Sequence, residues 1–249
     1  MNKLLLHKGA QPATIDEVNS IPAPAHTNTW APIAHGDYIQ IVKDEIEAQG
    51  WGIRSQEYGL KSGKLNEDEL VGAKLFGIIE LEPHKSDSEF SMCFGLRSSI
   101  DKSIPIGLFW GDSMFVCDNM MYSGEGELIK KHYPGNMAEL TSQVADVVED
   151  IDKKAKQREL TYEFYKSVHF TSEKFNDLAV RAMMKGVLPP SKMRELVNEW
   201  VNPRHKEFSD PTLFNAMNAF TEIAKTTPIV DAPIRLSALS ELIEDYCRA

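Results

Sequence analysis

The apolar residues of this chain change their spacing near residue 137, and this change constrains the fold more than any other feature. Before it, short runs rich in β-branched and aromatic residues are separated by polar turns, which is typical of β-strands. After it, apolar residues recur three or four positions apart, which is typical of amphipathic helices. We therefore expect an α+β fold: a mainly antiparallel sheet with flanking helices, followed by a helical C-terminal region.

The same change divides the chain into three parts. Residues 1–34 are rich in Pro, Ala and Thr, so we expect an extended N-terminal arm that either wraps a domain or forms a loosely ordered tail. Residues 35–136 form the expected α+β domain. Residues 137–249 form the expected helical region, packed on that domain or on a neighbouring subunit.

The α+β part begins with a predicted helix from His35 to Gly50, with Asp37 as the N-cap and Gly50 at the C-terminal end. The runs that follow predict strands and turns. We expect strands over residues 51–60, 71–81, 90–96 and 114–117, polar turns over 61–64 and 97–103, and a short helix-like segment over 127–132.

In the helical part, the spacing predicts one continuous amphipathic helix over residues 137–157. Its buried face is expected to contain Leu140, Val144, Val147 and Ile151. Further helices are predicted over residues 173–186, over 191–200 with Ser191 as the cap, from Asp210 as N-cap with Pro211 at the first helical position, and over 236–246.

Charge and composition limit the classes of partner. The net charge of −10 predicts weak non-specific attraction to nucleic acid and to acidic lipid. No apolar run approaches about 18 residues, so we expect no membrane partner. The three cysteines, Cys93, Cys117 and Cys247, have no CxxC spacing, which favours reduced core thiols, although a Cys93–Cys117 disulfide remains an alternative if their strands are neighbours.

The sequence contains no recognisable catalytic motif. None of the seven histidines makes an HExxH or a His/Cys pair at ligand spacing, and there is no GxSxG and no glycine-rich phosphate loop. We therefore predict no catalytic residue, no metal and no cofactor.

Three polar stretches stand out as candidate ligand contacts, each with a structural alternative. The turn over residues 97–103 could bind an anion or satisfy its own backbone. Residues 118–119 could line a pocket or fix the edge of the sheet. The basic run over residues 130–132 could contact a phosphate or end a helix in solvent. The candidate pocket residues are Ser99, Asp101, Asp118, Asn119 and His132. A weaker alternative is an enzyme with a pocket around Arg97, Asp101, Asp118, Asn119 and His132.

These stretches resemble a known family. The segments GLRSSIDKS over 95–103, FVCDNMMYSGE over 115–125, the basic residues before His132, and TLFNAMNAFTE over 212–222 are similar to those of the DUF932 family of phage- and plasmid-like proteins. The positions that fit the family pattern are Ser99, Asp101, Cys117, Asn119, Ser123, Gly124, His132, Asn218 and Glu222. Ile100 stands where the family usually has His, which argues against a catalytic histidine there. The resemblance covers about residues 35–245 and implies a mobile-element context rather than a particular activity.

The expected order of a helix and three antiparallel strands also resembles the core of the Rad52-like single-strand annealing proteins, which bind single-stranded DNA in a basic groove of an oligomeric ring. This resemblance implies cations and aromatic rings on one side of the sheet. The candidate nucleic-acid contacts are Arg54, Tyr58, Lys61, Lys64, Arg97 and Lys102, with Trp51 as a further ring, and Lys130 and Lys131 from the local basic run.

Together these observations give two hypotheses. The first is a phage- or plasmid-encoded accessory protein of DNA metabolism that binds single-stranded DNA or a replication or recombination partner. The second is an inhibitor that binds a protein of host defence or a host enzyme. In both cases we expect a homo-oligomer in the cytoplasm of a bacterial host, without enzymatic activity.

Overall fold

The expected α+β architecture is confirmed. The structure, a computed structural model, describes residues 10–83, 90–114, 120–122, 128–225 and 232–248. In these ranges a sheet of seven strands, with all pairings antiparallel, is flanked by helices and followed by a helical C-terminal region. None of the helices within these ranges has both the length and the apolar character that a membrane crossing needs.

The first six strands lie in the sheet in the same order as in the sequence. The order is β1 (Gln11–Ala13), β2 (Ile53–Leu65), β3 (Asp68–Leu81), β4 (Phe90–Ser99), β5 (Ile106–Met114) and β6 (Met120–Tyr122), and β7 (Leu128–Lys130) also pairs with β5. A tight turn connects β2 and β3, as antiparallel neighbours allow, whereas α1 and α2 lie between β1 and β2.

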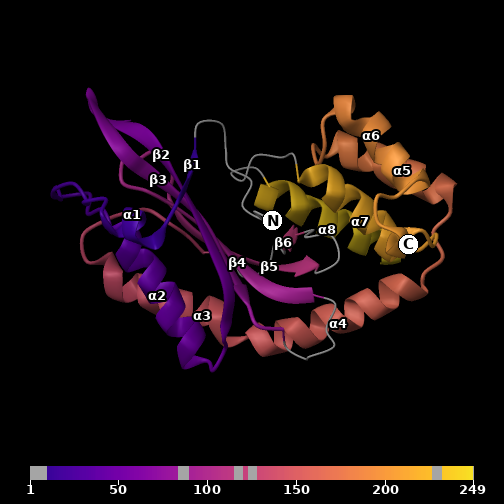
Figure 1. Ribbon diagram of the computed structural model, residues 1–249, viewed down its shortest axis with the longest axis horizontal. Coiled ribbons are helices and arrows are strands. Elements are labelled where there is room, and N and C mark those ends of the chain that lie inside the picture. The colour runs from indigo at the N-terminus through magenta and orange to yellow at the C-terminus, as the bar shows by residue number, and fades with distance from the viewer. Residues whose placement is uncertain (1–9, 84–89, 115–119, 123–127, 226–231, 249) are drawn as a thin grey trace.

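The helices lie on both sides of the sheet, which Figure 1 shows nearly edge-on. The helices α2 (His35–Ala48) and α3 (Asn136–Glu149) lie on one side, while α5 (Ser172–Met184), α6 (Met193–Val201), α7 (Leu213–Ala224) and α8 (Ala232–Arg248) form a group on the other. The long helix α4 (Ile151–Ser167) connects the two sides, and the β2–β3 hairpin projects beyond the helices. Shorter helices are α1 (Ile15–Asn19), η1 (Pro190–Lys192) and η2 (Lys206–Phe208).

The main core cluster contains residues of the helices on both sides of the sheet. Along β3, Leu75 and Ile79 point to the face on which α2 and α3 lie, and they belong to this cluster with Tyr38 and Val144. Phe76 and Ile78, which alternate with them, belong to a smaller cluster on the opposite face. This alternation follows from the period of two in a strand. Because side chains on both faces of β3 are buried, its sequence is a nearly continuous run of apolar residues.

The prediction of one continuous helix over residues 137–157 is wrong, because this part of the chain forms two helices, α3 and α4. Asp150 has φ −88° and ψ 10°, outside the helical region, and its carbonyl accepts the first backbone bond of α4 from Lys154. Aspartate competes for backbone groups and favours helix ends, which explains a break at this position. The burial expected for Leu140, Val144, Val147 and Ile151 is confirmed.

Two predictions for this part of the chain are wrong, the turn over residues 61–64 and the helix-like segment over 127–132. The turn expected over residues 61–64 lies inside β2, and the chain turns instead at Asn66 and Glu67, where Asn66 takes φ +58°. Asparagine tolerates this left-handed conformation. The strand expected over residues 114–117 begins earlier, as β5, which includes Met114, and residues 115–117 lie outside the described residues. The helix-like segment expected over 127–132 contains strand β7. Charged residues within β2 are compatible with a strand, because its hairpin exposes alternate side chains to water.

Three predicted helix caps are also wrong. The N-cap of α2 is Ala34 rather than Asp37, and that of α6 is Lys192 rather than Ser191. The N-cap of α7 is Thr212, whose side chain accepts a bond from the backbone of Asn215, rather than Asp210. Gly50, with φ +80°, follows the end of α2 as a left-handed residue, as expected for glycine there.

The predicted N-terminal arm contains two ordered elements within the described residues. β1 pairs with β2, and α1 begins at a capping box in which Thr14 and Glu17 bond each other's backbone. Val18 of α1 is fully buried. The predictions for Phe115, Val116, Cys117, Asp118, Asn119, Ser123 and Gly124 lie outside the described residues. Cys93 is buried in β4, and Cys247 is exposed in α8.

Candidate functional site

Cations gather at the end of the sheet near the β2–β3 hairpin. Lys61 of β2 lies directly opposite Lys74 of β3. Lys74 lies opposite Ser99 of β4, and Arg97 is two residues from Ser99, so Arg97 is a diagonal neighbour of Lys74 on the same face. Lys74 has no local signal in the sequence, because only the register of β2 and β3 brings it opposite Lys61.

Lys102 lies in the turn after β4, directly after Asp101, which is the ion-pair partner of Lys74. Its ammonium lies 4.6 Å from the centre of the Trp30 ring, and the Arg97 guanidinium lies 4.9 Å from the centre of the Phe109 ring. Rings in these positions hold cations by their electron-rich faces. We call Lys61, Lys74, Arg97 and Lys102 the cationic cluster. Lys64 is exposed nearby but lies opposite Glu69 across the hairpin, which offsets its charge.

The turn that follows β4 is closed by its own side chains. The Asp101 carboxylate accepts a bond from the Ser103 backbone at 3.0 Å and lies 3.6 Å from the Lys74 ammonium. The Ser99 hydroxyl donates to the Ile104 carbonyl at 2.9 Å and accepts from the Ile104 N–H at 3.0 Å. Burial raises the pKa of Asp101, but the hydrogen bonds from Ser103 and Ser99 and the charge of Lys74 outweigh it, so the net pKa is lowered. Asp101 is therefore a fixed anion inside the cationic cluster.

His132, another candidate pocket residue, is buried and bonded. Its Nδ1 accepts from the backbone N–H of Ile33 at 3.1 Å, and its Nε2 lies 3.5 Å from the Ser98 hydroxyl. Burial and the neighbouring His35 lower the pKa of His132 to about 4. Its place between a backbone amide and β4 makes it part of the packing rather than the wall of an open pocket.

Three predicted nucleic-acid contacts lie in environments that do not suit that role. Tyr58 is buried, and its hydroxyl donates to Gln56, so its ring cannot stack on a base; burial raises its pKa to about 12. Arg54 lies 3.8 Å from the buried Glu80 carboxylate. Lys130 is mostly buried and makes an ion pair with Glu139. Lys131 is exposed.

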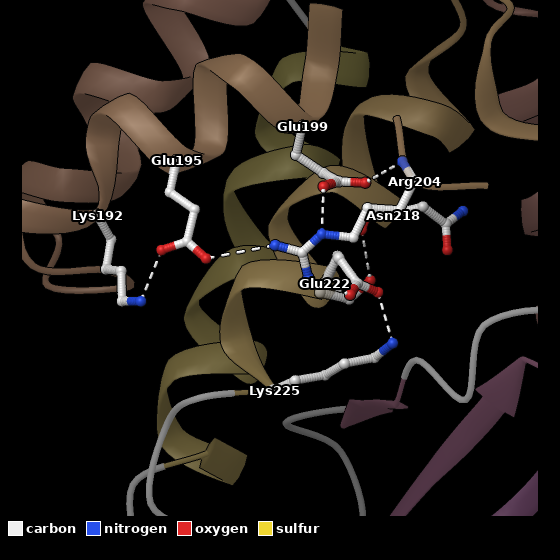
Figure 2. A network of polar contacts seen from close by, with 8 residues as sticks. Lys192, Glu195, Glu199, Arg204, Asn218, Glu222 and Lys225 are labelled. Carbon is white, nitrogen blue, oxygen red and sulfur yellow. Dashed lines mark hydrogen bonds and ion pairs between the residues drawn. The ribbon is translucent and has the colours of Figure 1, made fainter. Parts of the chain in front are cut away.

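A second polar network lies between α6 and α7, and the sequence gives no signal for it (Figure 2). The guanidinium of Arg204 contacts three carboxylates, at 3.2 Å from Glu199, 2.8 Å from Glu222 and 3.4 Å from Glu195. Lys192 and Lys225 bind the outer oxygens of Glu195 and Glu222. The three carboxylates are thus matched by three cations.

This network includes the two late residues of the family resemblance. Asn218 and Glu222 are one turn apart on α7, and both line a cavity with Glu199 and Trp200. The volume of this cavity, about 10 Å³, is near the minimum that holds a single water molecule. The network can fix the packing of α6 on α7, but it has no room for a substrate.

A third polar cluster is buried between β5 and α4, also without a clear signal in the sequence. The Asp112 carboxylate lies 2.9 Å from the Arg158 guanidinium and accepts a bond from the Tyr162 hydroxyl. Burial raises the pKa of Asp112, and the charge of Arg158 acts against this shift. Within the described ranges, no three or more His, Cys, Asp or Glu side chains form a group that could hold a metal ion.

Comparisons with known proteins give no relative of this chain: no family model, no curated protein and no solved structure matches it. The resemblances to the DUF932 family and to the Rad52-like proteins therefore stay predictions.

Proposed function

We propose that this protein is a phage- or plasmid-encoded accessory protein that binds single-stranded DNA in the cytoplasm of a bacterial host, and that the cationic cluster makes the contact. The observation that carries the proposal is the register that sets Lys61 directly opposite Lys74. Like charges directly opposite one another in a sheet are destabilising. An anionic ligand that lies over both lysines removes this repulsion.

The neighbouring groups strengthen the field of this pair. Arg97 lies diagonally across from Lys74, and Lys102 follows in the adjoining turn. Asp101 offsets part of the charge through its ion pair with Lys74. A local positive field can attract phosphate even in a chain with a net charge of −10, because charges beyond a Debye length of about 8 Å are largely screened at physiological salt.

The chemistry of the cluster also predicts how DNA would be held. The rings beneath the cations, Trp30 and Phe109, are buried and already covered by Lys102 and Arg97. Since Tyr58 is buried as well, base stacking should contribute little. We therefore expect binding that depends on phosphates, is insensitive to base sequence, and weakens steeply with salt.

The test is fluorescence anisotropy of a labelled oligothymidine titrated with protein over a salt series. Each lost phosphate contact should reduce the steepness of the plot of log affinity against log salt by about 0.7. We expect that reduction for Lys61→Gln and for Lys102→Gln. Lys185→Gln, at an exposed position after α5, is the matched control and should leave the slope unchanged. Absence of binding by the wild type at low salt and micromolar protein would overturn the proposal.

A second candidate function, inhibition of another protein by binding it, is supported by a different observation. Leu160 and Phe164 lie one turn apart on α4, and their exposed fractions are 66% and 49%. Neighbouring exposed apolar side chains on a helix are typical of a surface that another protein covers. If the wild type does not bind DNA in the anisotropy experiment, inhibition of another protein becomes the better hypothesis.

A further inference from the structure

The outer edge of β2 is only partly covered. β1 pairs with Tyr58, Gly59 and Leu60, whereas β2 begins five residues earlier, at Ile53. In the described part of the chain, β1 is the last strand on this side of the sheet. The edge of β2 before Tyr58 therefore has no strand beside it within the described residues.

The chain leaves this edge because of a specific local structure. Thr14 directly follows β1, and its side chain caps α1 by accepting from the backbone of Glu17. The Glu17 carboxylate returns to the Thr14 backbone at 2.7 Å. This capping box begins a helix where β1 would otherwise continue along β2.

A groove lies where β1 ends. Its volume is about 350 Å³, in the range of pockets that bind ligands. One wall is formed by the end of β1 and the start of α1, and the other by β2. The lining residues are Pro12, Ala13, Thr14, Ile15, Gln56, Glu57 and Tyr58.

The backbone of Gln56 points into this open edge. Pro12 has no N–H, so it cannot exchange backbone hydrogen bonds with Gly59. In an antiparallel ladder the hydrogen-bonded pairs are then the two on either side, Gln11 with Leu60 and Ala13 with Tyr58. Tyr58 thus directs its N–H and C=O toward β1. The register of β2 against β3 is regular from Ser55 to Lys61, so Gln56, two residues before Tyr58, directs its N–H and C=O the same way.

We propose that this groove binds an extended, basic segment of a partner protein, which pairs with the edge of β2 as an added strand. An open edge with a free ladder position binds extended chain through its backbone. The partly buried Ile15 suits an apolar side chain of that segment. Two carboxylates, Glu57 in the lining and Glu17 bonded to Thr14 of the lining, complement lysine or arginine at its other positions.

This inference does not depend on DNA binding, because it concerns the edge of β2 and not the cationic cluster. A suitable probe is a fluorescent seven-residue peptide of alternating lysine and valine. We expect it to bind the full-length protein, and we expect a peptide of alternating glutamate and valine not to bind. A lysine–valine peptide methylated at alternate backbone nitrogens keeps its charge but loses its donors, and it should bind at least tenfold more weakly.

Two substitutions at one position separate backbone pairing from side-chain contacts. Both Gln56→Ala and Gln56→Pro remove the side chain that accepts from the Tyr58 hydroxyl. Only the proline variant also removes the N–H that points out of the sheet, and proline is tolerated at such an edge. We expect peptide affinity close to that of the wild type for Gln56→Ala and at least tenfold weaker for Gln56→Pro.

Three results would overturn the proposal. The first is equal binding of the methylated and unmethylated peptides, which needs no variant and so remains decisive even if Gln56→Pro does not fold. The second is equal peptide affinity of the folded proline and alanine variants. The third is a wild-type dimer that becomes monomeric with Gln56→Pro but not with Gln56→Ala in sedimentation, since the edge would then be covered by a second copy of this chain.

Discussion

The imidazole of His132 accepts a hydrogen bond from the backbone N–H of Ile33, 99 positions earlier in the chain. Because Nδ1 is the acceptor, it carries no proton, and the neutral ring has its proton on Nε2, beside the Ser98 hydroxyl. The segment before α2, strand β4 and the residues after β7 therefore meet at one buried ring that must stay neutral.

We predict that the free energy of unfolding falls as the pH drops from about 6.5 to about 4. His132 and the buried His35 both have a pKa lowered to about 4, so in this window the unfolded chain binds protons that the folded chain does not. The negative charge of Asp101 raises the pKa of His35 and so opposes part of the lowering that burial causes. Each pKa unit corresponds to about 1.4 kcal/mol, so each ring can remove a few kcal/mol of stability.

Urea unfolding at several pH values between 7.5 and 4.5 measures this dependence. His132→Gln should give a flatter dependence of stability on pH than the wild type. His26→Gln, at an exposed position, is the control and should follow the wild type. If His132→Gln kept the full pH dependence of the wild type, the buried ring would not be its source.

The ion pair between Asp112 and Arg158 should be strongly coupled. Asp112→Asn leaves a buried guanidinium without its anion, and Arg158→Met leaves a buried carboxylate, so each should lower the stability by about 3–5 kcal/mol. The double variant should lose less than the sum of the two, because no charge remains buried alone. Urea unfolding of all four proteins gives the coupling, and additive losses would show that the two groups act independently.

The sequence predicted best where burial repeats with a regular period. The face of α3 and α4 that contains Leu140 and Val144 was predicted from spacing, because a helix buries every third or fourth residue whatever packs on it. Strand ends and caps were predicted less well. Residues 61–64 look like a turn in composition, and only the pairing of Gly63 and Lys64 with β3 shows that β2 continues through them.

The polar sites show why the candidate contacts were harder to predict. Tyr58 belongs to an alternating pattern, and such a pattern does not show which of the two sets of side chains is buried. The structure shows that Tyr58 is buried. Glu199 and Arg204 resemble solvated charges in the sequence, since the contact with Glu222 of α7 arises only when the helices pack. Contacts between elements that are far apart in the sequence produce no local spacing pattern from which they could be predicted.

Replacement of Arg204 should destabilise the helical region more than replacement of the outer cations of its network. Arg204→Met leaves the buried carboxylates of Glu199 and Glu222 without their shared cation, which should lower the stability by about 2–4 kcal/mol. Lys192→Met removes a part-exposed ion pair with Glu195 and should lower it by less than about 1 kcal/mol. Thermal unfolding compares the two variants, and equal losses would contradict a central role of Arg204.

The exposed pair on α4 gives a test of self-association. If protomers associate through Leu160 and Phe164, each side chain that becomes buried should contribute about 1.5–3 kcal/mol to association. Sedimentation equilibrium should then show an oligomer for the wild type and a monomer for the double variant Leu160→Glu, Phe164→Glu, with the melting temperature of the dilute protein unchanged. Val144→Asp, at a fully buried position, should instead unfold the protein. A wild type that stays monomeric at every concentration would exclude self-association, and the pair would then be available to a different protein.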